Sequence, residues 1–255
     1  MFYGSNRTEL KRNIKKEIRK IDFRIKFVKS TIIRMMEVPK SEYEGAGFIL
    51  YNKFTKDFVL GVSSTTGELE YMGGKPEGNE LPHQTAFNEL VEELGGNPLD
   101  EDWQTRVQVL HIFQPFSKKW IWCFFLSLSS TELEKVKQLS KDLDSWPMDL
   151  EKDFSSITGR PKPARKAITS IVSIYDNDFF NYIKNFTEWP QTKNRMADAK
   201  LYGAHESTKL LDGVIFHNYN VHVESKKLRG FNCVIFEQHL DWLKSVVDSV
   251  TCEQK

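Results

Sequence analysis

The sequence predicts an α/β protein, because short apolar runs typical of strands alternate along it with stretches that have the helical period. Two apolar runs, 46–51 and 58–62, are followed by a helical pattern at 82–94, and further strand and helix patterns come after it. A length of 255 residues corresponds to one large domain, or to one domain with a substantial appendage. Such a chain is long enough to bury a core without disulfides or metals as supports.

The composition excludes several classes of protein. The chain is 40% hydrophobic and 28% charged, which is inside the globular range and outside that of disordered, collagen-like or coiled-coil chains. Its longest apolar run, 120–126, is far shorter than a membrane span. The three cysteines lie far apart, which argues against a disulfide framework and against a sequence-local zinc site. Because no apolar leader precedes the first charged residues, we expect a soluble protein that is cytoplasmic or also nuclear.

A basic amphipathic helix is predicted for residues 1–40. Apolar residues recur at threes and fours from Leu10 to Ile32, and Pro39 ends the pattern. Residues 7–34 hold eleven Lys and Arg against three acids, a balance of +8, whereas the whole chain carries only +1. The helix either packs on the core through its apolar stripe or binds nucleic acid through its basic face. An anionic membrane surface is less favoured, because the stretch contains neither Trp nor Tyr.

The rest of the chain supplies the other predicted elements. Strands are expected where β-branched and aromatic residues cluster, at 46–51, 58–62, 69–72, 106–114 and 119–129. Helices are expected where apolar residues recur every turn, at 82–94, 131–143, 164–175 and 179–186. Residues 146–150 predict an irregular strand and corner, and 155–162 a loop. Beyond Pro190 the pattern weakens to a strand within 214–223 and a closing helix at 236–250.

The segment 73–96 holds the residues that point to chemistry. Gly73 and Gly74 end a predicted strand and allow the backbone to approach a ligand closely. Lys75 adds a mobile positive charge suited to a phosphate, and Glu80 stands in the loop before the helix.

Three further carboxylates, those of Glu89, Glu92 and Glu93, share one face of the predicted helix. Like charges at this spacing repel by about 0.2–0.5 kcal/mol per pair, and no basic residue lies within one turn along the helix. A hard divalent cation, Mg²⁺ or Mn²⁺, would relieve the repulsion and could bridge the carboxylates to substrate phosphates. The alternative is a solvated acidic helix face.

This segment resembles the box of the Nudix hydrolase family, G-x5-E-x7-R-E-U-x-E-E-x-G-U, in which U is aliphatic. The residues that match at the box spacing are Gly74, Glu80, Glu89, Leu90, Glu92, Glu93 and Gly95. Two positions depart from the box, since Asn88 replaces the arginine and Gly96 replaces an aliphatic residue. In the family that arginine pairs with the box carboxylates and orients them. Asn88 brings no charge, so the cluster loses electrostatic support.

The resemblance covers roughly residues 43–186 and implies an α/β/α sandwich with a mixed sheet. The Nudix-like domain would span 41–188, between the basic helix 1–40 and a C-terminal α/β extension, 189–255. That extension is interpreted as a dimerisation arm, a lid or a small subdomain, so an oligomer is one possibility.

The implied reaction is attack of water on a phosphoanhydride bond in a nucleoside diphosphate linked to another moiety. Glu89, Glu92 and Glu93 would be the catalytic metal ligands. Glu80 would be an auxiliary metal ligand, and Gly74 and Lys75 would line the metal and phosphate site.

Two hypotheses about function follow from the resemblance. The first is an active Nudix-type pyrophosphohydrolase that takes a nucleotide-type substrate, such as capped RNA, a dinucleotide or a nucleotide sugar. Within it, the basic helix favours capped RNA. The second is a catalytically weakened Nudix-fold protein that binds RNA or a nucleotide, with Asn88 as the mark of decay.

Three other features are interpreted mainly as ordinary structure. Cys123 is expected inside a buried strand. His83 could face a substrate, although an ordinary surface or core position is favoured. The basic loop 159–166 is expected to be solvated, with an added phosphate contact as the alternative.

Overall fold

The computed structural model describes residues 43–114, 118–187, 216–218, 236 and 239–252, which all belong to one unit, Lys40–Lys255. The predicted basic helix at 1–40 lies outside the described residues, as does most of the extension 189–255. Among the residues described, no helix combines the length and the apolarity that a membrane crossing requires.

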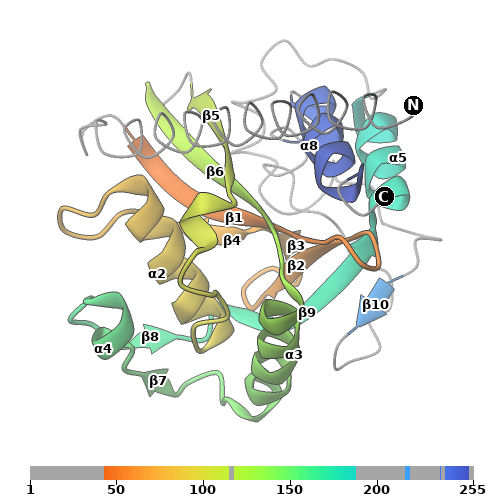
Figure 1. Cartoon of the computed structure of the whole chain (residues 1–255). Helices are drawn as coiled ribbons and strands as arrows, with labels where there is room; N and C mark the ends of the chain where they lie inside the picture. Colours follow the sequence, from red (N-terminus) through yellow and green to blue (C-terminus); the bar gives the residue numbers. More distant parts are fainter. Residues whose placement is uncertain (1–42, 115–117, 188–215, 219–235, 237–238, 253–255) are drawn as a thin grey trace, which may run out of the picture. The chain divides into compact units, whose positions relative to one another are not determined.

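An eight-stranded mixed sheet forms the centre of the unit (Figure 1). Six strands lie side by side in the order β10 (Phe216–Asn218), β9 (Ile168–Tyr175), β2 (Asp57–Ser63), β1 (Tyr43–Asn52), β6 (Lys119–Ser127) and β5 (Gln108–Gln114). Two short strands extend it, β3 (Leu69–Glu70) beside β2 and β4 (Met72–Gly74) beside β1. Strands β1 and β6 pair in parallel and the other pairs are antiparallel, so the expected mixed sheet is confirmed.

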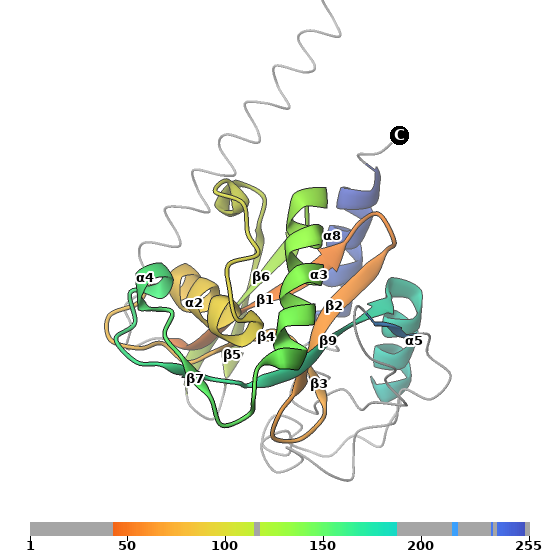
Figure 2. The same cartoon turned by 90° about the horizontal axis from the view of Figure 1, so that it is seen from below.

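Helices cover both faces of this sheet. In Figures 1 and 2, α2 (Pro82–Leu94) and α3 (Ser130–Ser145) lie on one face, and α5 (Asp176–Thr187) and α8 (Leu240–Cys252) lie on the other. Alternation along β1 explains both layers, because successive side chains of a strand point to opposite faces. Tyr51 belongs to the core that contains residues of α5 and α8, whereas Phe48 packs edge-on against Trp103 at a centroid distance of 5.1 Å. The expected α/β architecture is therefore confirmed.

Helix α2 has the bounds that the sequence predicts. Pro82 occupies its first turn, where a missing N–H is harmless, and the Gln84 side chain accepts a hydrogen bond of 2.8 Å from the Leu81 N–H. Gly95 ends the helix in the left-handed conformation, with φ 77°, which a glycine adopts without strain. These local signals fix the helix that carries the box carboxylates.

The helix predicted for residues 164–175 is wrong. The segment instead forms β8 (Ala164–Arg165) and then β9, which pairs antiparallel with β2 from Tyr175 to Ile168. Strand β9 is rich in β-branched residues, and Ile171, Val172 and Ile174 are all fully buried. Burial on both faces of a central strand hides the two-residue period, and its apolar positions then mimic helical spacing.

Two smaller expectations also change near this strand. Residues 146–150 form a turn rather than an irregular strand, and the following β7 (Glu151–Lys152) pairs with β8 in a separate two-stranded sheet. The expected loop 155–162 begins with a one-turn helix, α4 (Ser155–Thr158). The strand expected at 69–72 is divided into β3 and β4, and the described part of the strand expected within 214–223 is β10. The bounds of β1, β2, β5, β6, α3, α5 and α8 differ from the predicted ones by at most four residues.

Candidate active site

The box carboxylates of α2 lie against the end of β4 and are not a solvated surface. Glu93 is only 7% exposed, and the side chains of Glu89 and Glu92 are largely buried. A Cβ on Gly74 would collide with the Glu89 carboxylate, so the glycine at the strand end is what lets that carboxylate approach. The alternative of a solvated acidic helix face is therefore wrong.

The cation beside these carboxylates comes from a distant part of the chain. Arg160 follows α4 and Gly159, which turns the backbone with φ 70°, and its side chain is 4% exposed. Its Nε and Nη2 lie 2.7 and 2.9 Å from the two oxygens of Glu80. Its Nη1 lies 2.9 Å from both Glu89 Oε1 and Glu92 Oε2. One guanidinium thus contacts three of the four box carboxylates.

The expectation that the loop 159–166 is solvated is wrong at two of its basic residues. Besides Arg160, Lys166 is buried, and its Nζ donates to the carbonyls of Leu143 and Trp146 at 2.5 and 2.9 Å. Arg165 does remain exposed and pairs with Glu151 at 2.9 Å. The sequence held one signal for Arg160, because a box that lacks its arginine needs a cation from elsewhere.

Glu80 is the most firmly held member of the cluster. It accepts hydrogen bonds from Asn88 Nδ2 at 2.8 Å, Thr85 Oγ1 at 2.9 Å and the Glu77 N–H at 3.0 Å, in addition to those from Arg160. Burial raises the pKa of Glu80, but these donors outweigh it and lower that pKa to about 2. Asn88 therefore retains a hydrogen bond within the box but contributes no charge.

For the three carboxylates of α2, the effect of burial on the pKa outweighs that of the hydrogen-bond donors. Burial raises the pKa of Glu89 to about 7 and also raises that of Glu92, although Arg160 opposes both shifts. Burial raises the pKa of Glu93 well above its usual range, with the nearby Glu89 carboxylate as the next cause. Within the described part of the chain, Glu93 Oε2 is buried without a hydrogen-bond partner. The cluster therefore has more carboxyl groups than Arg160 can pair, and the metal-free fold favours their protonated forms.

The donor set fits a hard divalent cation. Carboxylate oxygens are the ligands that Mg²⁺ and Mn²⁺ prefer, and the unpartnered Glu93 Oε2 offers one of them. No three His, Cys, Asp or Glu side chains among the described residues already form a metal-binding group. Arg160 Nη1 instead bridges Glu89 and Glu92. The metal-ligand roles of these residues and of Glu80 stay predictions.

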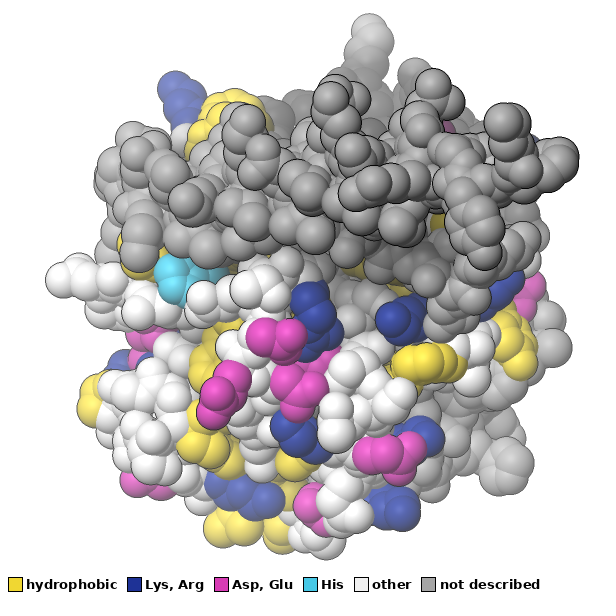
Figure 3. Space-filling view, in the orientation of Figure 1, with side chains coloured by type: hydrophobic (Ala, Val, Ile, Leu, Met, Phe, Trp, Pro, Cys, Tyr) yellow, Lys and Arg dark blue, Asp and Glu magenta, His cyan; other side chains and the backbone are white. Residues whose placement is uncertain are grey.

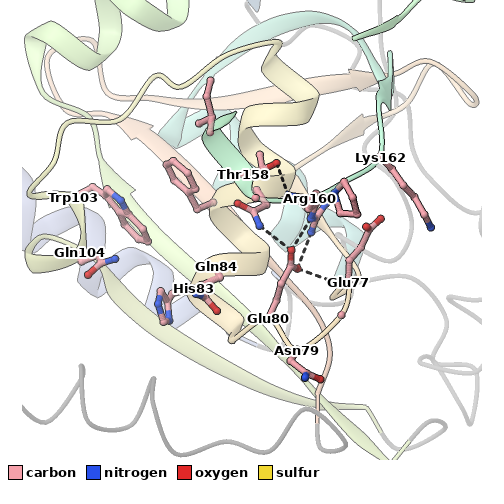
Figure 4. A pocket seen from close by; sticks show the side chains of 16 residues that line it. Glu77, Asn79, Glu80, His83, Gln84, Trp103, Gln104, Thr158, Arg160 and Lys162 are labelled. Atoms are coloured by element: carbon pink, nitrogen blue, oxygen red, sulfur yellow. Dashed lines mark hydrogen bonds and ion pairs between the residues drawn. The ribbon is translucent and has the colours of Figure 1, made fainter. Parts of the chain in front are cut away.

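A pocket of about 910 Å³ adjoins the cluster (Figure 4). Glu80 and Arg160 meet on one side of it, and His83, Trp103 and Gln104 lie on the other. Trp103, in the short 3-10 helix η2 (Trp103–Thr105), stacks on Phe87 with ring centroids 6.1 Å apart and an interplanar angle of 6°. The walls therefore combine charged and amide groups with an aromatic surface, a combination typical of sites for polar ligands with a ring.

His83 has a less ordinary place than the sequence indicates. It lines this pocket, and its Nδ1 is buried with no hydrogen-bond partner among the residues that the structure describes. Burial also lowers the pKa of His83, which favours the neutral ring at neutral pH. A neutral ring with a free nitrogen can exchange one hydrogen bond with a ligand.

Of the other two predicted site residues, one lies at the carboxylate cluster and the other does not. Gly74 lies next to Glu89, as expected of a residue that lines the site. Lys75 is exposed and is not among the residues that line the pocket. The sequence did not indicate Trp103, and it indicated Arg160 only as part of the basic loop 159–166, with a phosphate contact as the alternative role. Both residues reach the site through the fold.

Charges are mixed on the face of the molecule that Figure 3 presents. In its described part, Lys and Arg side chains lie beside Asp and Glu side chains in small groups, without a broad patch of one sign. The predicted RNA-binding surface at 1–40 lies outside the described residues.

No family model matches the chain, and no curated protein matches it. Among solved structures, it is similar to an Ap4A hydrolase from C. elegans, with a TM-score of 0.26, 20% identity, and coverage of 34% of this chain and 68% of that one. It is also similar to a bifunctional NMN adenylyltransferase/ADP ribose pyrophosphatase from Francisella tularensis, with a TM-score of 0.33 and 12% identity. That match covers 60% of this chain and 39% of the other.

Proposed function

We propose that this protein is a divalent-metal-dependent hydrolase that cleaves a phosphoanhydride bond in a nucleoside diphosphate-linked substrate. One observation carries the proposal: three carboxylates of α2 are buried together, and a single guanidinium, that of Arg160, pairs with two of them, Glu89 and Glu92. The third, Glu93, is the most deeply buried, and its Oε2 has no partner among the described residues. Such an excess of buried carboxylates is unfavourable for folding and is typical of a site that binds cations. The adjoining pocket offers room for a nucleotide-sized ligand.

Each box residue has a part in the proposed reaction. Bound divalent metals would neutralise the diphosphate, orient the attacking water and lower its pKa. Glu89, Glu92 and Glu93 would hold the metals, with Glu80 as an auxiliary ligand. Glu89, the middle carboxylate of the cluster, would also help to take the proton from the attacking water. Gly74 and Lys75 would face the metal and the phosphates.

The substrate class follows from the pocket and from the sequence. The stacked pair Phe87 and Trp103 and the amide of Gln104 suit a nucleoside, which has a ring with polar edges. Capped RNA stays a prediction that rests on the basic residues at 1–40. An oligomer formed through residues 189–255 also stays a prediction.

Turnover of a substrate panel tests the proposal. The protein is incubated with Mg²⁺ or Mn²⁺ and with capped RNA, ADP-ribose, dinucleoside polyphosphates and nucleoside triphosphates, and product release is followed with and without a chelator. We expect turnover of at least one substrate and its loss on chelation. Glu92→Gln and Glu93→Gln should abolish turnover and keep the circular dichroism spectrum of the wild type.

Glu151→Gln is the matched control, since it removes a carboxylate whose only described partner is the exposed Arg165. It should leave turnover unchanged. A chain that turns over no substrate, or full activity in both box variants, would contradict the proposal.

A nucleotide-binding protein without catalysis is the second candidate. It is favoured by the combination of Asn88 with Arg160, because a guanidinium already occupies oxygens that a metal would need. In that case a panel member would bind with unchanged affinity after chelation, and no product would form.

A further inference from the structure

Arg160 belongs to the carboxylate cluster and to the pocket wall at once. Its Nη1 bridges Glu89 and Glu92, which do not line the pocket, whereas Arg160 itself does. We propose that this guanidinium is an exchangeable group: a divalent cation displaces Nη1 from Glu89 and Glu92, and the freed edge then binds a phosphate of the substrate in the pocket. The inference rests on the proposed function and assigns Arg160 as its phosphate-binding residue.

The anchoring of Arg160 permits the exchange without a large movement. Glu80 accepts from Nε and Nη2 at 2.7 and 2.9 Å, and these two bonds do not involve Glu89 or Glu92. Glu80 is itself fixed by hydrogen bonds from Thr85 and Asn88. Loss of the Nη1 contacts would therefore leave the guanidinium held in its plane by a bidentate pair, with one edge available.

The charges favour a divalent cation over the guanidinium at the carboxylates of Glu89 and Glu92. One positive charge is shared among Glu80, Glu89 and Glu92, while Glu93 Oε2 has no partner in the described part of the chain. A divalent cation brings twice the charge and accepts several oxygens at short range, which Nη1 cannot do. The two cations also compete for the same atoms, Glu89 Oε1 and Glu92 Oε2.

The pocket side favours an anion near the freed edge. Lys162 follows Arg160 by two residues and lines the same pocket (Figure 4). Gly159 between α4 and Arg160 has open space where a side chain would stand, so nothing from that residue blocks the approach. Guanidinium groups bind phosphate oxygens in pairs, which a lysine ammonium cannot do.

A purely structural role for Arg160 predicts the opposite result. If the guanidinium only holds the carboxylates in position, its removal disorders them and weakens metal binding. If it competes with the metal, its removal strengthens metal binding. The sign of the change in metal affinity therefore separates the two roles.

Mn²⁺ titration, with free Mn²⁺ followed by electron paramagnetic resonance, provides this test on the full chain without a substrate. We expect Arg160→Gln to bind Mn²⁺ more tightly than the wild type, on the order of tenfold, as for two linked ligands that exclude each other. Arg165→Gln is the matched control, because it removes the same charge from an exposed residue five positions away. It should leave Mn²⁺ affinity unchanged.

A second titration follows the phosphate side of the exchange. The probe is methylenediphosphonate, a diphosphate analogue whose bridge is not hydrolysed, at saturating Mn²⁺. Arg160→Gln should weaken its binding by about tenfold, and Arg160→Lys should show a smaller loss because a charge remains without the paired donors. Tighter metal binding together with weaker diphosphonate binding is not expected of a residue that only supports the fold. If Arg160→Gln does not fold, Arg160→Lys carries both measurements.

Unchanged or weaker Mn²⁺ binding in Arg160→Gln overturns the inference, and so does unchanged diphosphonate binding. Wild-type turnover with either result means that only the inference fails. Mn²⁺ binding by Arg160→Gln but not by the wild type supports the exchange and counts against the proposed hydrolase. If neither protein binds Mn²⁺, the inference is overturned, and the turnover panel judges the proposed function separately.

Discussion

Two arginines of this protein, the partly exposed Arg106 and the buried Arg160, have contrasting surroundings. Arg106 forms a bidentate pair with the fully buried Glu132, at 2.6 and 3.1 Å, and one further ion pair with the exposed Asp102. Arg160 instead faces Glu80, Glu89 and Glu92 at once. Arg106 therefore pairs with one buried carboxylate, whereas Arg160 pairs with three largely buried carboxylates.

The pKa values of the carboxylates express this difference. Although burial raises the pKa of Glu132, hydrogen bonds from Arg106 and from the backbone N–H groups of Asp100 and Ser129 lower it overall. For Glu89 and Glu93, burial dominates and the pKa is raised. A carboxylate whose oxygens are all bonded is held in its charged form, and its removal leaves its partners unpaired, whereas a buried cluster with too few partners is typical of a place where a further ion can bind.

Removal of Glu132 should produce the largest loss of stability. Its carboxylate also completes the capping box of α3 with Ser129, so Glu132→Ala leaves the helix end and the partly exposed Arg106 without this partner. We expect the free energy of unfolding to fall by about 2–4 kcal/mol, measured by urea denaturation, because the cap is lost and the backbone N–H groups of Asp100 and Ser129 lose their acceptor. Glu134→Ala, on the exposed side of the same helix, should change it by less than about 0.5 kcal/mol. Equal effects of the two substitutions would mean that the Arg106–Glu132 pair contributes no more to stability than an exposed ion pair does.

A methyl group on Gly74 should produce the next largest effect. The Cβ of Gly74→Ala would collide with the Glu89 carboxylate, so the strand end or the side chain must shift, at a cost of about 1–3 kcal/mol. We expect turnover to fall more than stability, because Glu89 is displaced from the cluster. Gly78→Ala is the control: its Cβ meets no atom, and only its positive φ of 51° opposes the change. Full turnover in Gly74→Ala would show that the position of Glu89 is not important.

The sequence could predict α2 and its carboxylates because all their signals are local. Pro82 and Gly95 fix the ends of the helix, and helical periodicity alone puts Glu89 and Glu93 on one face. Arg160 could not be predicted in its role, because it lies 71 residues from Glu89 and reaches it only when α4 packs near α2. The helix prediction for 164–175 was wrong for a related reason. The pairing of β9 with β2 is a long-range contact, and it overrides the local spacing of apolar residues.

The pH dependence of stability should show that Glu132, unlike the carboxylates near Arg160, is held in its charged form. Because the pKa of Glu132 is lower in the folded state, its contribution is complete above the unfolded value, about 4.3. It is then lost as the pH falls through the folded pKa. The difference in unfolding free energy between the wild type and Glu132→Ala should therefore be constant from pH 6 to 8 and shrink below about pH 4.3. A difference that grew on acidification would mean that Glu132 is not held as a carboxylate.

Substitution of Glu93 should have the smallest effect on stability and the opposite sign. The raised pKa of Glu93 means that the metal-free folded state binds its proton more tightly than the unfolded chain, so stability falls as the pH rises above the unfolded value. Glu93→Gln resembles the protonated form, and we expect its unfolding free energy at pH 8 to equal or exceed that of the wild type. Turnover should nevertheless drop by at least about 100-fold.

The comparison with Glu132 makes this result specific to the site. Both residues are buried glutamates, yet one substitution should destabilise the protein and leave the activity per folded molecule intact, while the other should remove activity and preserve the fold. Thermal unfolding in a chelator and in Mn²⁺ adds a final discriminating measurement. Mn²⁺ should raise the melting temperature of the wild type and of Glu132→Ala, because a ligand bound only by the folded state stabilises it. Glu93→Gln should lose that increase, since it lacks the carboxylate whose Oε2 has no partner among the described residues.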